Sequence, residues 1–157
     1  MARADKSVGR DRLQAPSLLQ SSILIVEDNE LLARFASDVL SFSGCKTSVA
    51  SSVCAAFEAL DRTPYDAVVL DLTLSGRSSL PVADELLRRG IVFVITSGHV
   101  GLSLQPRYRK APYLTKPFAA SDLLQAVERL LSASGDSRSG GRRQSSRRCR
   151  RRCKGTR

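Results

Sequence analysis

The chain has 157 residues and a formal net charge of +10, from 25 lysine and arginine residues against 15 acidic residues. This length is enough for one domain with an apolar core. No apolar run approaches the roughly 18 residues of a membrane span, and the polar N-terminal segment lacks the apolar stretch of a signal peptide. We therefore expect a cytoplasmic protein. The four cysteines include no CxxC pair, so the sequence supports neither a zinc site nor a disulfide framework.

The positive charge is concentrated at one end of the chain. Residues 21–131 carry 11 Lys/Arg and 12 Asp/Glu, whereas residues 132–157 carry 10 Lys/Arg and one Asp. The second segment is rich in serine, glycine and arginine and cannot build a core. Residues 1–20 are polar and show no sustained hydrophobic period. These patterns predict a disordered leader at 1–20, a folded domain at 21–131 and a disordered Arg-rich tail at 132–157.

The first half of the domain alternates between apolar runs typical of buried strands and amphipathic stretches typical of helices. In chain order these are a strand at 22–26, a helix at about 29–42, a strand at 46–50, a helix capped by Ser51 or Ser52, and a strand at 67–70. Glu27-Asp28 follow the first strand, and Asp71 follows the third.

The second half continues the same alternation. In chain order we expect a loop at 77–80, a helix from Pro81 to Gly90, a strand at 91–96, an irregular stretch at 100–110 with room for at most a short helix, a strand at 111–115, and a helix at 120–131. Ser97-Gly98 follow the fourth strand, and Lys116-Pro117 follow the fifth.

Strands and helices in this order predict a parallel sheet with right-handed crossovers. Five strands fit an α/β fold of the flavodoxin-like (βα)5 type, a three-layer sandwich with strand order 2-1-3-4-5, better than a dinucleotide-binding fold with six. No GxGxxG or P-loop motif follows the first strand, which argues against a nucleotide cofactor.

Carboxylates gather at the carboxyl edge of this predicted sheet, where open α/β folds place ligand chemistry. A lone Asp71 would more often be a helix cap or a turn residue. Together, however, Glu27, Asp28 and Asp71 would repel one another and raise their own pKa values unless a cation lay between them. Oxygen ligands with room for water suit Mg²⁺ better than zinc.

The loops after the fourth and fifth strands add a hydroxyl and a lysine to the same edge. Aspartate can form an acyl phosphate as a covalent intermediate. Mg²⁺ and Lys116 would neutralise charge on the phosphoryl oxygens, and Ser97 or the adjacent Thr96 could donate a hydrogen bond to one of them. The constellation therefore has the parts needed to accept a phosphoryl group.

These motifs resemble the receiver, or phospho-acceptor, domain of bacterial two-component response regulators over residues 21–131. The matching residues are Glu27-Asp28, Asp71, Ser97-Gly98, Lys116-Pro117-Phe118, and Tyr113 at the position of the family's switch aromatic. The resemblance implies that Asp71 is phosphorylated and that Asp28, Asp71 and the Thr73 carbonyl bind Mg²⁺, with Glu27 assisting through water. It also implies a cis bond before Pro117. Ser97 is preferred to Thr96 as the switch hydroxyl, because the family places that hydroxyl directly before a small residue, here Gly98.

The sequence also departs from the family pattern. Ser75 stands where the family often has proline, which we expect to loosen that loop, and the stretch from Asp71 to Lys116 is shorter than usual. Leu74-Ser75-Gly76 and Pro81-Val82-Ala83 resemble a subgroup of stand-alone receivers common in alphaproteobacteria.

Three functions compete. The first is a non-enzymatic signalling module, phosphorylated by a sensor histidine kinase or a histidine phosphotransfer protein and acting through contact with a downstream protein. The second is a regulator in which the receiver controls nucleic-acid binding by the basic tail, since too little chain follows the domain for a folded helix-turn-helix. The third, an aspartyl-phosphate phosphatase, is disfavoured because Thr73 stands where such hydrolases place a second Asp as general acid. His99, the only histidine, is expected to be a solvated loop residue.

Overall fold

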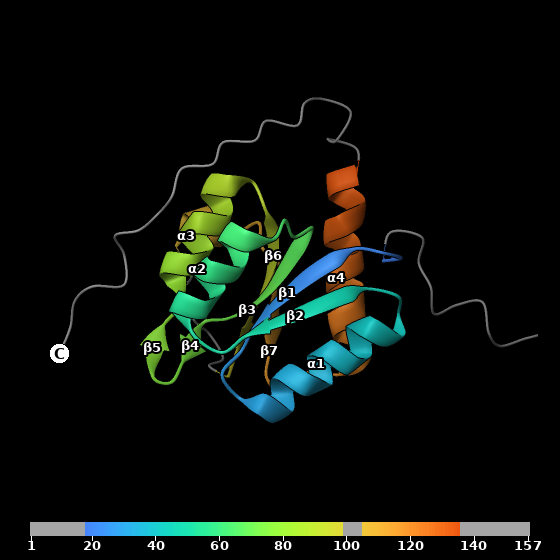
Figure 1. Ribbon diagram of the computed structural model, residues 1–157, viewed down its shortest axis with the longest axis horizontal. Coiled ribbons are helices and arrows are strands. Elements are labelled where there is room, and N and C mark those ends of the chain that lie inside the picture. The colour runs from blue at the N-terminus through green and yellow to red at the C-terminus, as the bar shows by residue number, and fades with distance from the viewer. Residues whose placement is uncertain (1–17, 99–104, 136–157) are drawn as a thin grey trace, which may run out of the picture.

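The computed structural model describes residues 18–98 and 105–135 (Figure 1). Residues 1–17, residues 99–104 with His99, and residues 136–157 of the Arg-rich segment lie outside the described residues. The described elements are β1 (Ser22–Val26), α1 (Glu30–Phe42), β2 (Lys46–Ala50), α2 (Val53–Arg62), β3 (Ala67–Asp71), β4 (Thr73–Leu74), β5 (Arg77–Ser78), α3 (Leu80–Arg89), β6 (Val92–Ser97), the 3-10 helix η1 (Pro106–Tyr108), β7 (Tyr113–Thr115) and α4 (Ala120–Gly135).

Five strands form one parallel sheet in the order β2-β1-β3-β6-β7. Strands β4 and β5 belong to a separate hairpin, so β6 and β7 are the fourth and fifth strands of this sheet. The order is therefore the predicted 2-1-3-4-5, and the flavodoxin-like fold is confirmed. Helices α2 and α3 cover one face of the sheet, and α1 and α4 cover the other (Figure 1). Because all the strands run the same way, their carboxyl ends meet at one edge.

The central strands are buried because helices lie on both of their faces. All five residues of β3 are buried, and four of the five in β1. Successive side chains of β1 point to opposite faces: Leu24 and Val26 join the core under α2 and α3, whereas Ile23 and Ile25 join the core under α1 and α4. Each such side chain stabilises the fold by roughly 1.5–3 kcal/mol relative to an exposed one.

Two helix ends have clear local causes, one at the carboxyl edge of the sheet and one at its amino edge. Asn29 is the N-cap of α1, and its Oδ1 accepts hydrogen bonds from the backbone N–H groups of Leu31 and Leu32 at 3.0 and 3.1 Å. This cap begins the helix immediately after Glu27-Asp28 and so fixes the loop that carries them. Gly90 ends α3 in the left-handed conformation, with a φ of 67°, as glycine allows without a Cβ clash.

The folded part extends beyond the predicted range of 21–131 at both ends. Leu18, in the segment expected to be disordered, is buried in the core under α1 and α4, and its carbonyl accepts a hydrogen bond from the Cys45 thiol at 3.3 Å. Helix α4 continues four residues past 131, to Gly135. Small residues such as Ala133 and Ser134 do not break a helix, and the Ser134 hydroxyl donates to the Leu130 carbonyl at 2.8 Å.

The segment expected to be a loop at 77–80 is also different. Thr73–Leu74 and Arg77–Ser78 pair as a two-stranded antiparallel hairpin, β4-β5, and α3 begins at Leu80. Between β6 and β7, the described residues contain only the three-residue helix η1, in agreement with the irregular stretch expected there. Tyr108 of η1 is buried, and its hydroxyl donates to Asp84 of α3 at 2.6 Å.

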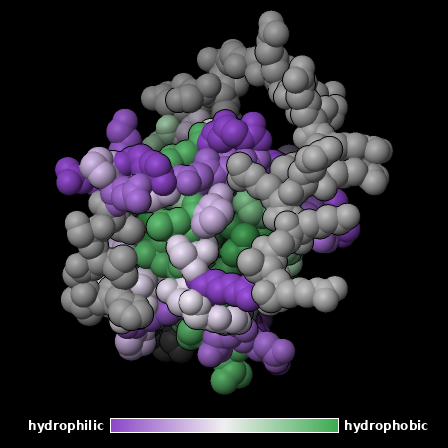
Figure 2. Space-filling model, turned by 90° about the vertical axis from the view of Figure 1, so that its left-hand side faces the viewer, coloured by the Kyte–Doolittle hydropathy of each residue, from purple (hydrophilic) through white to green (hydrophobic). Residues whose placement is uncertain are grey.

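The side of the molecule that carries α2 and α3 shows hydrophobic surface among hydrophilic residues (Figure 2). Leu87 of α3 is 43% exposed, next to the charged pair of Arg88 and Glu85. Within residues 18–98 and 105–135, no helix is long and apolar enough to cross a membrane.

Candidate functional site

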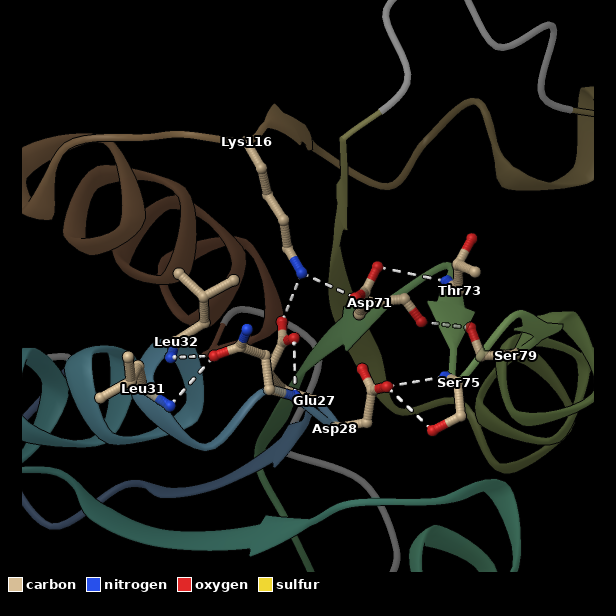
Figure 3. Close-up of polar contacts among 10 residues, drawn as sticks. Glu27, Asp28, Leu31, Leu32, Asp71, Thr73, Ser75, Ser79 and Lys116 are labelled. Carbon is tan, nitrogen blue, oxygen red and sulfur yellow. Dashed lines mark hydrogen bonds and ion pairs between the residues drawn. The ribbon is translucent and has the colours of Figure 1, made fainter.

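Three carboxylates meet at the carboxyl edge of the sheet (Figure 3). Glu27 and Asp28 directly follow β1, and Asp71 is the last residue of the neighbouring strand β3. One carboxylate oxygen from each residue lies within 4.8 Å of the other two. Glu27 and Asp71 are buried, whereas Asp28 is half-buried. The structure thus brings together the acidic residues that the sequence assigned to this edge.

Lys116 enters the acidic group from the loop after β7. Its Nζ lies 2.5 Å from Glu27 Oε2 and 2.6 Å from Asp71 Oδ2, and its side chain is only 14% exposed. The bond from Lys116 to Pro117 is cis, as the resemblance implied. The Lys116 N–H donates to the Ser97 carbonyl at 2.8 Å, which ties the lysine loop to the end of β6. One ammonium against three carboxylates leaves the site with an excess of negative charge.

The pKa values of the site reflect burial and this pairing. Burial raises the pKa of Glu27, and the negative charge of Asp71 adds to the effect, although hydrogen bonding to Lys116 opposes it. Burial alone would lower the pKa of Lys116, but its hydrogen bonds to Asp71 and Glu27 outweigh burial and raise it. Lys116 therefore remains an ammonium in this environment and acts as a fixed positive charge.

Asp28 has a different partner, the hairpin β4-β5. Its Oδ2 accepts hydrogen bonds from the backbone N–H of Ser75 at 2.7 Å and from the Ser75 hydroxyl at 3.0 Å. Burial tends to raise the pKa of Asp28, but the two bonds from Ser75 outweigh burial and lower it. We expected Ser75 to loosen its loop; instead it ties the loop to Asp28.

The carboxylate and carbonyl of Asp71 are held by residues that follow it in the chain. Its Oδ1 accepts from the Thr73 N–H at 3.2 Å, and its carbonyl accepts a hydrogen bond from the Ser79 hydroxyl. Ser79 also donates its N–H to the Leu72 carbonyl at 2.9 Å and is fully buried. These contacts fix the backbone that carries Asp71 and the start of the hairpin.

The two candidate hydroxyls lie at the end of β6. Thr96 is the register partner of Asp71, and Ser97 is the last residue of the strand. Both are buried. The choice of Ser97 as the switch hydroxyl stays a prediction. Tyr113 begins β7 and packs partly buried against the core under α2 and α3, so its switch role also stays a prediction.

The residues fit the divalent cation that the sequence predicts. Oxygen-only donors within 4.8 Å of one another are the ligand chemistry of Mg²⁺, and within residues 18–98 and 105–135 the group includes no sulfur or imidazole ligand. Glu27, Asp28 and Asp71 would hold such an ion, as would the Thr73 carbonyl that the resemblance adds. The acidic edge is therefore suited to a hard cation next to Asp71.

Comparison with known proteins places this geometry in a family. Residues 23–128 match the response regulator receiver domain. The chain belongs to this family. It is 35% identical over 124 residues to the sensory transduction protein RegX3 of Mycobacterium bovis, an alignment that covers 74% of this chain and 53% of the relative. The RegX3 protein of Mycolicibacterium smegmatis is 32% identical over 129 residues, covering 77% of this chain and 55% of the relative. The receiver therefore spans about half the length of these curated relatives.

Solved structures agree with this assignment. The solution structure of SdrG from Sphingomonas melonis is 34% identical, with a TM-score of 0.62, and the alignment covers 73% of this chain and 98% of that chain. NtrX from Brucella abortus, solved in complex with ADP, is 28% identical with a TM-score of 0.70, but the alignment covers 76% of this chain and only 29% of that chain. The receiver fold thus resembles both a chain of similar extent and part of a longer one.

The sequence analysis named Ser75 only as a departure from the family pattern, and it did not assign Ser79 to the site. Ser75 and Ser79 each donate a hydrogen bond into the acidic loops, and neither belongs to the motifs that carried the prediction. The dipeptide Ser75-Gly76 between two short segments was the available signal, because such pairs close two-residue hairpins. A hairpin at this position would have brought Ser75 close to the sheet edge.

Proposed function

We propose that this receiver accepts a phosphoryl group on Asp71, with Mg²⁺ bound, in two-component or phosphorelay signalling. The observation that carries the proposal is the grouping of Asp71 with Glu27, Asp28 and Lys116 at one sheet edge. The donor would be a phosphohistidine on a sensor histidine kinase or a histidine phosphotransfer protein. Members of this family are generally signalling modules rather than enzymes, and we propose no turnover of external substrates.

Each residue of the site has a separate role in the proposed phosphoryl transfer. A carboxylate oxygen of Asp71 attacks the phosphorus; the new O–P bond forms as the N–P bond of the phosphohistidine breaks, and the imidazole nitrogen keeps the electron pair. Lys116, already held at Asp71, offsets the charge that gathers on the phosphoryl oxygens. When bound, Mg²⁺ would supply further charge neutralisation through Asp28, Asp71 and Thr73. Ser97 would then hydrogen-bond a phosphoryl oxygen and so report phosphorylation to β6.

A protein partner is supported by apolar side chains beside the acidic edge. Leu31, in the first turn of α1, is 79% exposed, and Phe35 one turn later is 38% exposed. The Phe35 ring lies 6.3 Å from the ring of Phe118, which follows the Lys116-Pro117 bond. We propose that the phosphodonor protein docks here, in the cytoplasm, and that phosphorylation changes a contact with a downstream protein.

The proposal is tested with a small phosphodonor such as acetyl phosphate and intact-mass analysis. The wild-type chain should gain one phosphoryl group when Mg²⁺ is present and none when it is chelated. Asp71→Asn should stay folded and gain no mass. Labelling of this variant to the wild-type extent would show that Asp71 is not the acceptor.

A further inference from the structure

We propose that Ser75 is a positioning residue for Asp28: it holds Oδ2 of this carboxylate and thereby presents the other oxygen, Oδ1, to Mg²⁺. Both donors of Ser75 converge on the same atom, the N–H at 2.7 Å and the hydroxyl at 3.0 Å. In Figure 3 the second oxygen of Asp28 lies on the side of Asp71. The inference rests on the proposed function, because it gives Ser75 a role only if Asp28 binds a cation.

Asp28 needs such support more than its neighbours do. Lys116 holds Glu27 and Asp71 with short ion pairs, whereas the side chain of Asp28 is held by Ser75 from a separate hairpin. Asp28 is also the half-buried member of the acidic group. A carboxylate that can rotate freely must be ordered when it binds an ion, and hydrogen bonds to its distal oxygen remove that cost beforehand.

The backbone of the hairpin is built to deliver Ser75 to Asp28. Ser75 and Gly76 form its two-residue loop with positive φ values of 49° and 76°, the pattern of a type I′ turn. A proline, which the family often has here, could not take this φ and would lack the N–H that Asp28 accepts. Serine in place of proline therefore allows a hydrogen bond to Asp28 that a proline at position 75 could not make.

The other end of the hairpin is anchored to the phospho-acceptor strand. Ser79 follows β5 and donates its hydroxyl to the Asp71 carbonyl and its N–H to the Leu72 carbonyl. Leu74 of β4 is 3% exposed and packs in the core under α2 and α3. The hairpin is thus fixed to β3 at its base and to Asp28 at its tip, so it links the two loops that supply the carboxylates.

The test is a Mg²⁺ titration of the full-length chain without phosphodonor, by calorimetry or by NMR chemical shifts. Ser75→Gly and Ser75→Ala form a matched pair, because both remove the hydroxyl while glycine suits the positive φ and alanine does not. We expect the dissociation constant for Mg²⁺ to rise roughly tenfold in both, the lower end of the loss typical of groups that orient metal ligands. Thermal unfolding should separate the pair, with the glycine variant the more stable.

The outcomes distinguish this inference from the proposed function. If wild type binds Mg²⁺ and both variants bind it equally well or more tightly, Ser75 does not position Asp28 and the inference fails alone. If only the alanine variant is weakened, in step with its stability, Ser75 acts through the hairpin backbone and the hydroxyl has no such role. If wild type itself does not bind Mg²⁺, the proposed function fails and the inference falls with it.

Discussion

Replacing Lys116 by methionine tests whether the acidic edge is a charge cluster that needs a cation. Methionine keeps an unbranched stem but removes the ammonium that lies 2.5 Å from Glu27 and 2.6 Å from Asp71. Removing one partner of a buried ion pair typically costs about 3–5 kcal/mol. Because the lysine and carboxylate side chains retain 14% and 8% exposure and water can reach them, we expect a loss of about 2–3 kcal/mol in the free energy of unfolding.

The assay is thermal unfolding of wild type and Lys116→Met, each with EDTA and with excess Mg²⁺. For a domain of this size the expected loss corresponds to a fall of about 10 °C in Tm with EDTA. Mg²⁺ should stabilise the variant more than wild type, because the ion no longer competes with an ammonium, so the difference in Tm should narrow. Lys110→Met is the matched control, since Lys110 is exposed and its loss should change stability by less than about 0.5 kcal/mol. Equal losses in both variants, or a difference in Tm that Mg²⁺ leaves unchanged, would show that Lys116 does not offset the charge of the acidic group.

Three further predictions concern the switch hydroxyl, pH and the tail. Ser97→Ala should blunt the NMR shift changes that phosphorylation causes and Thr96→Ala should not; equal effects would void the choice between them. Hydrogen bonds from Arg88 and then Arg89 lower the pKa of Glu85 from 4.5 to about 2. The stability that ionised Glu85 adds to the folded state is therefore fully present above pH 4.5 and is lost as the pH falls toward 2. The pKa shift sets a ceiling of about 3.4 kcal/mol on the free energy of unfolding that Glu85 contributes, and since Arg88 is 68% exposed we expect about 1–2 kcal/mol. Urea unfolding of wild type and Glu85→Gln between pH 2 and pH 6 measures it. A stability difference that does not change with pH would show that the ion pairs of Glu85 contribute nothing. Removing residues 136–157 should leave Tm and phosphorylation unchanged, whereas any nucleic-acid binding should weaken steeply with salt and vanish with the tail; binding that survives truncation would place it on the folded domain.

The sheet and the grouping of the acidic residues with Lys116 at one edge could be predicted from the sequence, because both depend on local pattern. Apolar runs fixed β1 and β3, and a parallel sheet necessarily brings the residues after its strands to one edge. The order of the strands alone therefore predicted that Glu27, Asp71 and Lys116 lie at the same edge of the sheet. The family resemblance then added what pattern alone does not contain, such as the cis bond before Pro117.

The contacts of Ser75 and Ser79 could not be predicted in the same way. Strands of two residues show no alternation of apolar and polar side chains, so the β4-β5 hairpin left only the Ser75-Gly76 dipeptide as a signal. The bond from Ser75 to Asp28 joins residues 47 positions apart and depends on the exact turn type. Leu18 was missed for a related reason, because a single apolar residue in a polar segment carries no period.

The proposed function depends above all on Asp71 being the residue that accepts the phosphoryl group. The most direct measurement is to phosphorylate the full-length chain with Mg²⁺ and acetyl phosphate, reduce the acyl phosphate with borohydride, and map the modified residue by peptide mass spectrometry. Reduction converts a phosphorylated aspartate into homoserine, so we expect homoserine at position 71 and unmodified aspartate at position 28. Homoserine at position 28 instead, or a phosphoryl group on His99, would show that Asp71 is not the acceptor.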